Sequence, residues 1–468
     1  MGTEKNDFPK TYVITCAQAK GDKFQKGYPN NNLIEGIKKY CGEKNAEFLI
    51  LPVAGRSIKE RKLHKDLAEM DNIFSDGGGN LINKKLNSNI YISDMRVPPQ
   101  NVDPSSGRGR FVQRDKTLII AHPKQRFKAF PNSNFDLPKI LIGTGAVTFP
   151  NYNKMDHRGD AAWRDHNYGF VVVEVVNDKI FHFRQVRSLQ NGKFIDLGLE
   201  FNGMEKPKQA DLEALVLGDL HWGDTDPAVH EVNYEMIEEF NPKRLIIHDL
   251  FNGHSVNHHN IGKLVTLVRE VYQKGRNNLK KELEQCYEEL YRLSQKMGDR
   301  DVVIVASNHN EFLNRYLEEV RLKDDPENAY FASELMPRMM KGEDPVRAGI
   351  EMIGKIPKNV RFLRRDEDYK VLGWQLGSHG DKGMNGSKRA NMTSREFSNG
   401  KSITGHSHTP EILRETYVIG TSTYLNLPYT QGQASSWMNT NALLWNNGTV
   451  ELVNIIHTGK NKCEWRLN

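Results

Sequence analysis

Asp219 and His221 form a short motif whose side chains could bind a metal ion together. They follow an apolar run at residues 214–217 and then Gly218, a pattern that predicts a buried strand ending at the motif. Residues two apart on an extended backbone lie on the same side, so both side chains would face one point. A carboxylate combined with an imidazole suits Mn, Fe or Zn better than Mg or Ca. Because an Asp-x-His pair is also common in surface turns, a metal site requires further ligands.

More polar clusters in the C-terminal half follow apolar segments that predict strands. In chain order they are Asp249, Asn308-His309, His379 and Gly405-His406-Ser407-His408. In α/β proteins the carboxyl ends of parallel strands share one edge of the sheet, and ligand sites gather there. Surface turns would not produce so many clusters on one edge by accident. We therefore expect the clusters to converge in one site.

This ordered set resembles the signature of the calcineurin-like metallophosphoesterase family, which reads D-x-H, D, N-H-(D/E), H and G-H-x-H. The resemblance covers about residues 210–456. The order and types of these residues are also similar to the nuclease branch of the family, which includes repair exonucleases and DNA-degrading proteins of large tailed phages. The resemblance implies an α/β fold, with a four-layer α/β/β/α sandwich at residues 206–468. A second α/β domain of unknown role is expected at residues 1–205.

The resemblance also implies two divalent metal ions, expected to be Mn, with Mg, Fe and Zn as alternatives. It assigns Asp219, His221 and His408 to one ion, Asn308, His379 and His406 to the other, and Asp249 to both. A hydroxide activated by the metal pair would attack the phosphorus atom in line with the leaving oxygen. His309 would be the catalytic residue that stabilises the transition state and protonates the leaving group, or it would only support the ligands.

The chain departs from the family pattern beside these ligands. Asn310 replaces the acidic residue that follows the catalytic histidine, so the group that orients His309 is open, with Glu311 as one option. His248 replaces a Gly and either supports a ligand or has no role. Asp249 is followed by Leu-Phe-Asn where phosphoprotein phosphatases have Asp-Arg-Gly, which argues against that branch.

Metal pairs of this kind cleave monoesters or diesters. The favoured function is a DNA nuclease that hydrolyses phosphodiester bonds, and the alternative is a phosphomonoesterase or a small nucleotide or cyclic phosphodiesterase. An inactive binding protein on the same fold is a third class, but the complete ligand set argues against it. No sequence-reading motif is present, so DNA would be held non-specifically through its backbone.

The candidate substrate contacts are His254 and the basic loop at residues 382–401. In that loop, the expected phosphate contacts are Lys388, Arg389, Arg395 and Lys401. The alternative is that the basic loop is only a solvated surface and that the histidine lies in a polar loop without a role.

Apolar periodicity predicts the elements that position these residues. Strands at residues 12–14 and 48–51 flank a helix at 32–40, which predicts a parallel crossover unit. Segments 361–363 and 369–375 are expected to pair as strands. Further strands are expected at 118–120, 140–142, 169–176, 179–186, 245–247 and 302–305.

Two helices are predicted near the ligand clusters. Asp226-Pro227 is expected to begin one of them, with Asp224 and Asp226 as caps. Residues 261–297 predict a long helical stretch with a break near Gly275. This stretch contains a short coiled-coil seam, which is formed by Leu279, Leu283, Cys286, Leu290 and Leu293. The seam would either pack inside the domain or contact a second copy in a homo-oligomer.

The composition is that of an ordinary globular protein, with 468 residues, 38% hydrophobic and 26% charged. No apolar run approaches the ~20 residues of a membrane helix, and four scattered cysteines do not form a disulfide framework. We therefore expect a cytoplasmic protein without a membrane partner, in the host cytoplasm if a phage encodes it. The net charge of +6 favours anionic partners but is too small to prove nucleic-acid binding.

Overall fold

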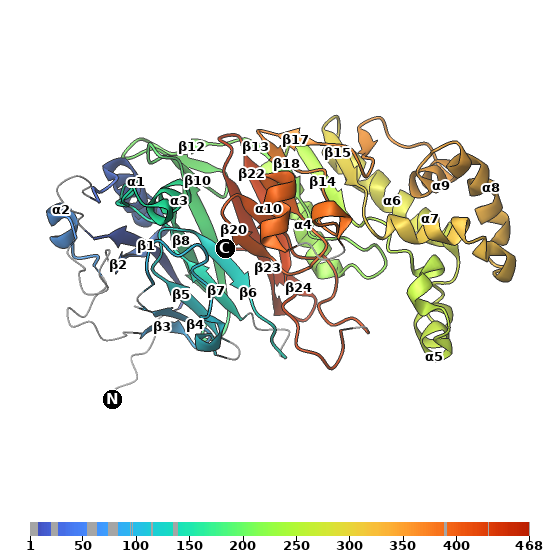
Figure 1. Cartoon of the computed structure of the whole chain (residues 1–468), viewed down its shortest axis with the longest axis horizontal. Coiled ribbons are helices and arrows are strands. Elements are labelled where there is room, and N and C mark those ends of the chain that lie inside the picture. The colour runs from blue at the N-terminus through green and yellow to red at the C-terminus, as the bar shows by residue number, and fades with distance from the viewer. Residues whose placement is uncertain are drawn as a thin grey trace.

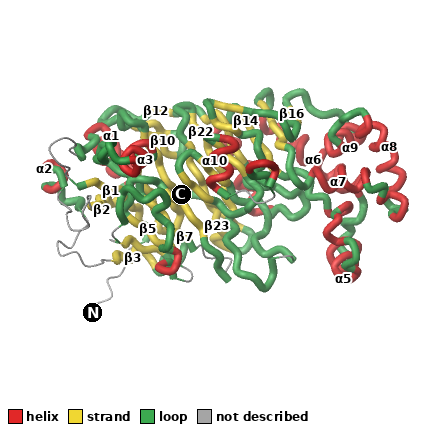
Figure 2. Tube along the Cα trace, viewed as in Figure 1, coloured by secondary structure: helices red, strands yellow, loops and turns green. Residues whose placement is uncertain are grey.

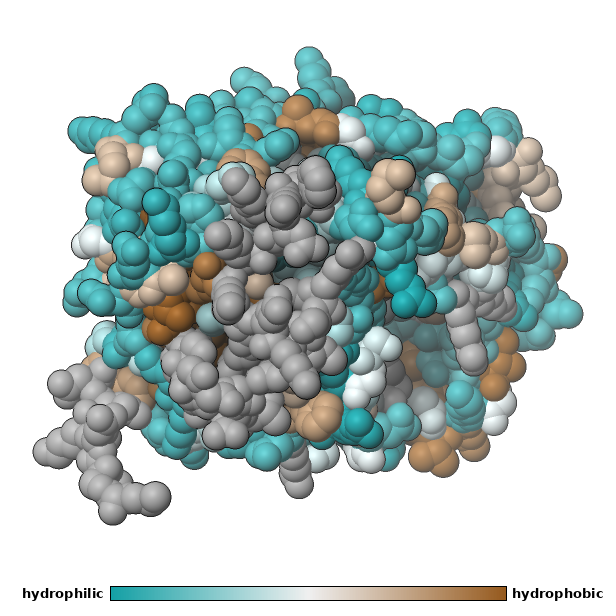
Figure 3. Space-filling model, turned by 60° about the vertical axis from the view of Figure 1, so that its left-hand side comes forward, coloured by the Kyte–Doolittle hydropathy of each residue, from teal (hydrophilic) through white to brown (hydrophobic). Residues whose placement is uncertain are grey.

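The computed structural model describes residues 8–19, 27–53, 63–73, 83–93, 95, 97–113, 116–133, 139–387, 391–428 and 430–467. Over these residues the chain forms three β-sheets, here called sheets I, II and III, with helices packed on them (Figure 1, Figure 2). In the described residues, no helix combines the length and the apolar character needed to cross a membrane. The surface seen in Figure 3 is mostly hydrophilic, with small hydrophobic patches.

Sheet I is formed by strands from the first half of the chain. Its order is β12 (Lys208–Gln209), β11 (Leu199–Phe201), β10 (Phe194–Asp196), β9 (Phe181–Ser188), β8 (Tyr168–Val175), β1 (Lys10–Gln18) and β2 (Ala46–Val53). The predicted crossover is confirmed, because β1 and β2 are parallel and α1 (Asn31–Lys44) connects them. The strands expected at residues 169–176 and 179–186 are also confirmed, as β8 and β9, which pair antiparallel.

Sheet II contains the strands that precede the first three ligand clusters. Its order is β16 (Val360–Phe362), β15 (Asp301–Val305), β14 (Arg244–His248), β13 (Leu212–Val216), β22 (Asn439–Trp445), β23 (Val450–Gly459) and β24 (Lys462–Glu464). Strands β13 to β16 are parallel neighbours. The nearly continuous burial of β13, β14 and β15 explains the apolar runs in the sequence.

Sheet III combines strands from both halves of the chain. Its order is β17 (Lys370–Val371), β18 (Trp374–Gln375), β19 (Ser402–Thr404), β21 (Thr416–Val418), β20 (Glu411–Leu413), β6 (Arg126–Ala129), β7 (Ile140–Gly143), β5 (Thr117–Ile120), β4 (Ile90–Ser93) and β3 (Asn83–Asn87). Strands β6 and β20 join the halves, with Phe127 opposite Ile412. The two expected domains therefore share one hydrogen-bonded sheet, and the boundary at residues 205 and 206 stays a prediction.

The predicted pairing of residues 361–363 with 369–375 is wrong. Strand β16 lies beside β15 in sheet II, whereas β17 and β18 form a small hairpin at the edge of sheet III. Both segments are short, so the local pattern does not determine which sheet each one joins.

A hydrophobic core lies between sheet III and the other two sheets. Ile14 of β1, Val216 of β13 and Ile403 of β19 belong to it and are fully buried. The alternating residue Val13 lies on the other face of β1, where it packs with Leu33 of α1. These contacts confirm a mixed α/β protein, while the four-layer order over residues 206–468 stays a prediction.

Helices also pack on sheet II, where they form its second core. They are α4 (Pro227–Phe240), α6 (Leu279–Met297), α7 (Asn310–Glu318), α8 (Ala329–Met340) and α9 (Pro345–Ile353). The smaller helices are α2 (Lys65–Ala68), α3 (His157–Arg164), α5 (Leu264–Thr266) and α10 (Met392–Asn399). As predicted, the Asp226 side chain caps α4 by accepting from the Ala228 N–H at 2.9 Å.

The predicted stretch at residues 261–297 is broken, as expected. Helix α5 continues into one π-helical turn at Leu267–Tyr272, and Gly275 then has a φ of 64° before α6 begins. All five residues of the predicted seam are fully buried in the core beneath α6. The seam therefore packs within the chain, and a homo-oligomer stays a prediction that would need another surface.

Candidate metal centre

The carboxyl ends of the strands in sheets II and III bring the predicted ligands together. Asp249 directly follows β14, and its carbonyl accepts from the His221 N–H at 2.7 Å beside β13. In sheet III, the His379 carbonyl accepts from the Gly405 N–H at 2.8 Å and so joins the segments after β18 and β19. The His406 N–H then donates to Asp219 Oδ2 at 2.6 Å, which links the two sheets.

The first predicted ligand set forms a tight cluster. Donor atoms of Asp219, His221, Asp249 and His408 all lie within 4.8 Å of one another. His221 Nε2 is 2.9 Å from His408 Nε2 and 3.3 Å from Asp249 Oδ2. His408 Nε2 is also 3.3 Å from Asp219 Oδ2. These atoms could share one ion, since donors bound at about 2.0–2.2 Å lie at such separations.

The second predicted set adjoins the first through Asp249. His379 Nε2 is 3.1 Å from Asp249 Oδ2 and 3.1 Å from Asn308 Oδ1. His406 Nδ1 is also 3.1 Å from Asn308 Oδ1. The seven predicted ligands are thus contiguous, with Asp249 between the two sets; their roles as ligands stay predictions.

His248 supports one of these residues from behind. Its Nδ1 lies 3.3 Å from Nδ1 of His379, and its side chain is fully buried. A hydrogen bond on that side leaves His379 Nε2 directed at Asp249 and Asn308. Of the two alternatives left open by the sequence, the geometry favours a supporting role.

The backbone at the site is held in an uncommon conformation. His221, Asp249, His406 and His408 all have positive φ values, between 44° and 75°. This region costs residues other than glycine about 1–2 kcal/mol each, and such strain concentrates at functional sites. At Gly405 the constraint is space, because a Cβ there would lie 2.0 Å from Asp219 Oδ1.

The electrostatics and donor atoms fit a bound cation. Burial outweighs the attraction of His379 and raises the pKa of Asp219 to about 8. Burial also lowers the pKa of His221 to about 3, so this imidazole is neutral, the form that binds metals. Among the described residues, Asp219 Oδ1 and Asp249 Oδ1 are buried without a hydrogen-bond partner. A cation would satisfy both oxygens, and the number and identity of metal ions stay predictions.

His309 lies at the solvent side of the cluster and is partly exposed, as is Asn308. Its ring centroid is 4.5 Å from that of His221. Its Nδ1 is 2.7 Å from the carbonyl of Asn252, which orients the ring. Glu311 does not orient it, because this carboxylate pairs with Arg365 at 3.1 Å.

The predicted role of Asp224 as a helix cap is wrong, because α4 is capped by Asp226, and Asp224 is instead a functional candidate. It accepts a hydrogen bond from Asn252 Nδ2 at 2.9 Å and pairs with Arg276 at 2.8 Å. His254 Nε2 also lies 2.9 Å from this carboxylate. Asp224 therefore connects the predicted substrate contact His254 to the residue that orients His309. Pro227 marks Asp226 as the cap, but no local signal reveals the role of Asp224, because its partners lie in distant loops.

Of the four basic residues predicted to contact phosphate, the structure describes two, Arg395 and Lys401. Lys388 and Arg389 lie outside the described residues. Arg395 is only 4% exposed, and its guanidinium donates to the Thr404 hydroxyl at 2.8 Å, so it does not face a phosphate. Lys401 is exposed but pairs with Glu415 at 3.4 Å.

No protein-family model matches the chain. Protein A1 of Escherichia phage T5 is 26% identical over 473 residues, which span 95% of this chain and 81% of that protein. The solved structure of Chaetomium thermophilum Vps29 has 13% sequence identity and a TM-score of 0.23, and covers 40% of this chain and 94% of its own. The expected likeness to phage proteins is therefore supported by a relative of nearly full coverage, and the metallophosphoesterase family stays a prediction.

Proposed function

We propose that the chain is a metal-dependent phosphoesterase that hydrolyses phosphodiester bonds of DNA. The observation that carries the proposal is the convergence of two buried carboxylates, four histidines and one amide from separate strand ends. Two carboxylates cancel only about half of the charge of two divalent cations, so a loaded site would attract a phosphate. DNA as substrate is supported by the resemblance of the ligand order to the nuclease branch and by the net charge of +6.

The seven predicted ligands would bind the metal ions in two sets. Asp219, His221 and His408 would hold one metal ion, and Asn308, His379 and His406 a second, with Asp249 between them. The bound metals would supply an activated hydroxide and neutralise charge on the phosphoryl oxygens. The buried carboxylates and the strained backbone keep the ligands in place before substrate arrives.

His309 would act on the leaving group. A carbonyl oxygen only accepts, so the contact with Asn252 requires the proton on Nδ1 and leaves Nε2 free to act. When the ring is protonated, Nε2 can donate to a phosphate oxygen or to the departing oxygen. This geometry holds the second nitrogen at a fixed orientation beside His221.

The test is one assay series with Mn. The substrates are plasmid DNA, linear DNA, bis-p-nitrophenyl phosphate and p-nitrophenyl phosphate, with and without chelator. The proposal expects cleavage of DNA and of the diester, and loss of both in Asp249→Asn, since Asn tolerates the positive φ at this position. The control Asp366→Asn changes an exposed carboxylate that, among the residues the structure describes, pairs with Arg364 alone.

Calorimetric titration with Mn supplies a readout that does not depend on turnover. Asp249→Asn should weaken Mn binding, and Asp366→Asn should not. Turnover of the monoester alone would favour the phosphomonoesterase instead. Unchanged DNA cleavage by Asp249→Asn, or in chelator, would refute a metal-dependent reaction at this site.

A further inference from the structure

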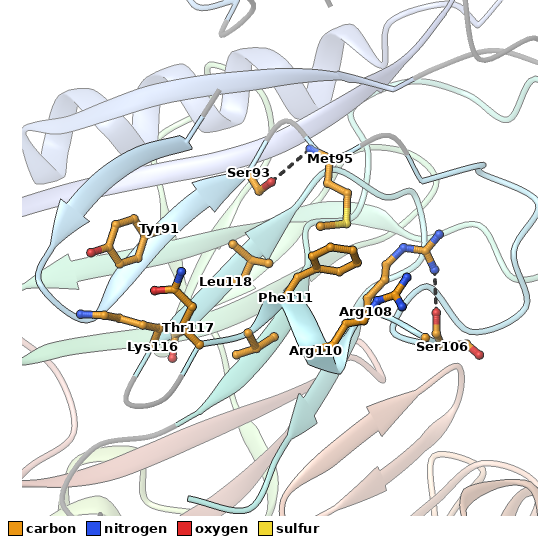
Figure 4. Close-up of a pocket in the computed structure, with 13 residues that line it drawn as sticks. Tyr91, Ser93, Met95, Ser106, Arg108, Arg110, Phe111, Lys116, Thr117 and Leu118 are labelled. Atoms are coloured by element: carbon orange, nitrogen blue, oxygen red, sulfur yellow. Dashed lines mark hydrogen bonds between the residues drawn. The ribbon is translucent and has the colours of Figure 1, made fainter. Parts of the chain in front are cut away.

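A cavity of about 690 Å³ opens on the N-terminal part of sheet III. Tyr91 of β4 and Leu118 of β5 lie on neighbouring strands beneath it. The loop that contains the 3-10 turn Gly109–Phe111 forms its wall (Figure 4). The cavity shares no residue with the metal-ligand cluster. It is therefore a second candidate site with its own chemistry.

The described lining of the cavity is cationic. Arg108, Arg110 and Lys116 contribute to it, and no Asp or Glu is among its residues. The Asp103 carboxylate attracts Arg108 electrostatically, but it is already paired with Arg126 at 2.9 Å. Arg108 Nη1 donates to the Ser106 carbonyl at 2.9 Å, which fixes the guanidinium and leaves further N–H groups for a ligand. The cavity therefore suits an anion.

The cations lie toward the two ends of the cavity, and the Arg110 guanidinium also lies over the Phe111 ring, 5.1 Å from its centroid. Figure 4 shows Phe111, Leu118 and Met95 in the middle, with Lys116 at one end and the two arginines at the other. The Phe111 side chain is 49% exposed although it is aromatic. A Cβ on Gly109 would lie 2.5 Å from the Phe130 ring, so this glycine lets the turn pack closely on the sheet. The turn thus holds the Phe111 ring over the cavity.

We propose that this cavity binds a nucleotide unit of single-stranded DNA. The base would stack on Phe111, and the phosphates on its two sides would meet Lys116 at one end and Arg108 and Arg110 at the other. A small anion would not use the exposed ring, and an apolar ligand would not use the cations. Stacking on an aromatic ring between cationic contacts is the general physical basis of sequence-tolerant strand binding. The proposal extends the DNA-directed function above but does not depend on cleavage.

The test measures binding of fluorescein-labelled oligo-dT of about 12 nucleotides by anisotropy, with the full chain in chelator so that no hydrolysis occurs. Phe111→Ala should weaken binding at least about fivefold. Arg110→Ser should weaken it and reduce the salt dependence by about 0.7 in the log–log slope. Tyr330→Ala and Arg164→Ser are matched controls, since both side chains are more than 70% exposed outside the cavity, and neither should change binding.

Competition with dTMP shows whether the cavity binds a free nucleotide or requires a nucleotide within a strand. If dTMP displaces the oligonucleotide, and Phe111→Ala weakens dTMP binding too, a single nucleotide is sufficient. If only the oligonucleotide is affected, the flanking phosphates are required, and both results support the site. Equal affinity of Phe111→Ala, Arg110→Ser and the unaltered protein would overturn it. Turnover of bis-p-nitrophenyl phosphate should be unchanged in both variants, so this result and the metal-site result are independent.

Discussion

His309 Nδ1 lies 2.7 Å from the backbone carbonyl of Asn252 and can only donate to it. The bond fixes the tautomer of the ring and the direction of Nε2. The Asn252 side chain is in turn bonded to Asp224 at 2.9 Å. The position of the predicted catalytic histidine therefore depends on a carboxylate that it does not touch.

His309→Gln should lower kcat for a phosphodiester by about 10²–10⁴-fold, because proton transfer from a positioned side chain contributes this much. Mn binding should not change, since His309 is not among the predicted metal ligands. Initial rates with bis-p-nitrophenyl phosphate and calorimetry with Mn measure the two effects. His157→Gln, on an exposed residue at the start of α3, is the control. Retention of full kcat by His309→Gln would remove the histidine from the reaction.

Asp224→Asn should lower kcat about tenfold with little change in KM, because it disturbs the loop that orients His309 without touching the ligands. The distinguishing measurement is a double-mutant cycle. In the His309→Gln background, Asp224→Asn should have almost no further effect on kcat. If the two effects multiply, Asp224 acts on the reaction by another route.

The sequence predicts which residues of this site come together better than it predicts what supports them. Ligand types follow from apolar runs that end in Asp, Asn or His, and strand ends share a sheet edge for purely geometric reasons. The partner of His309 is a backbone carbonyl, which has no side-chain signature. Pro227 identifies Asp226 as a helix cap, but the role of Asp224 follows from its contacts with Asn252, His254 and Arg276, which the local sequence does not reveal.

How far the fold can be predicted from the sequence depends on the length of each strand and on how far apart its partners lie in the chain. Almost continuously buried strands such as β8 and β14 are visible as apolar runs. Most strands of sheet III have only two to four residues, and residues far apart in the chain pair there, as in β6 and β20. Such short segments carry too little pattern to specify register or partner.

Gly405→Ala should abolish activity and Mn binding. The added Cβ would lie 2.0 Å from Asp219 Oδ1, so the carboxylate or the loop must move. Gly42→Ala in α1 is a matched control, because nothing lies within 4 Å of its Cβ, and Ala favours a helix by about 0.5–1 kcal/mol over Gly. Calorimetry with Mn and thermal melting check both variants. Normal Mn affinity in Gly405→Ala would show that the loop can shift enough to accommodate the added Cβ.

Stability should fall in acid because of a buried histidine remote from the metal centre. His122 Nδ1 accepts from the Lys124 N–H at 3.0 Å, so protonation would break this bond. Burial and the Lys124 charge lower the pKa of His122 to about 3. The unfolded chain binds this proton below its pKa of 6.5, so the stabilisation is complete above that value and is lost as the pH falls toward 3.

For His122 alone, the loss between about pH 8 and pH 5 is about 2 kcal/mol. Urea unfolding at the two pH values measures it. His122→Asn keeps an acceptor that does not titrate, so its pH-dependent loss should be smaller than that of the unaltered protein by about this amount. Identical pH dependence of the two proteins would show that His122 is already protonated or is not buried in solution.

A buried ionic cluster should hold sheets I and II together. Arg184 of β9 bonds both oxygens of Asp196, at 2.6 and 2.9 Å, and lies 3.4 Å from Glu451 of β23 in the other sheet. Burial raises the pKa of Glu451 well above its usual range, and the nearby Asp196 adds to this, so the cluster has one carboxyl that can stay neutral. Arg184 is the cation that compensates the Asp196 charge.

Arg184→Met should therefore destabilise the protein by about 3–5 kcal/mol at neutral pH, since it leaves a buried carboxylate without its partner. Arg184→Lys keeps the charge but not the two-pronged bond, and should lose less. The loss in Arg184→Met should shrink in acid, because protonation of Asp196 and of Glu174, which also pairs with Arg184 at 3.1 Å, removes the uncompensated charge. Urea unfolding of the three proteins at neutral and acid pH separates this electrostatic cause from lost packing, which would give the same loss at both.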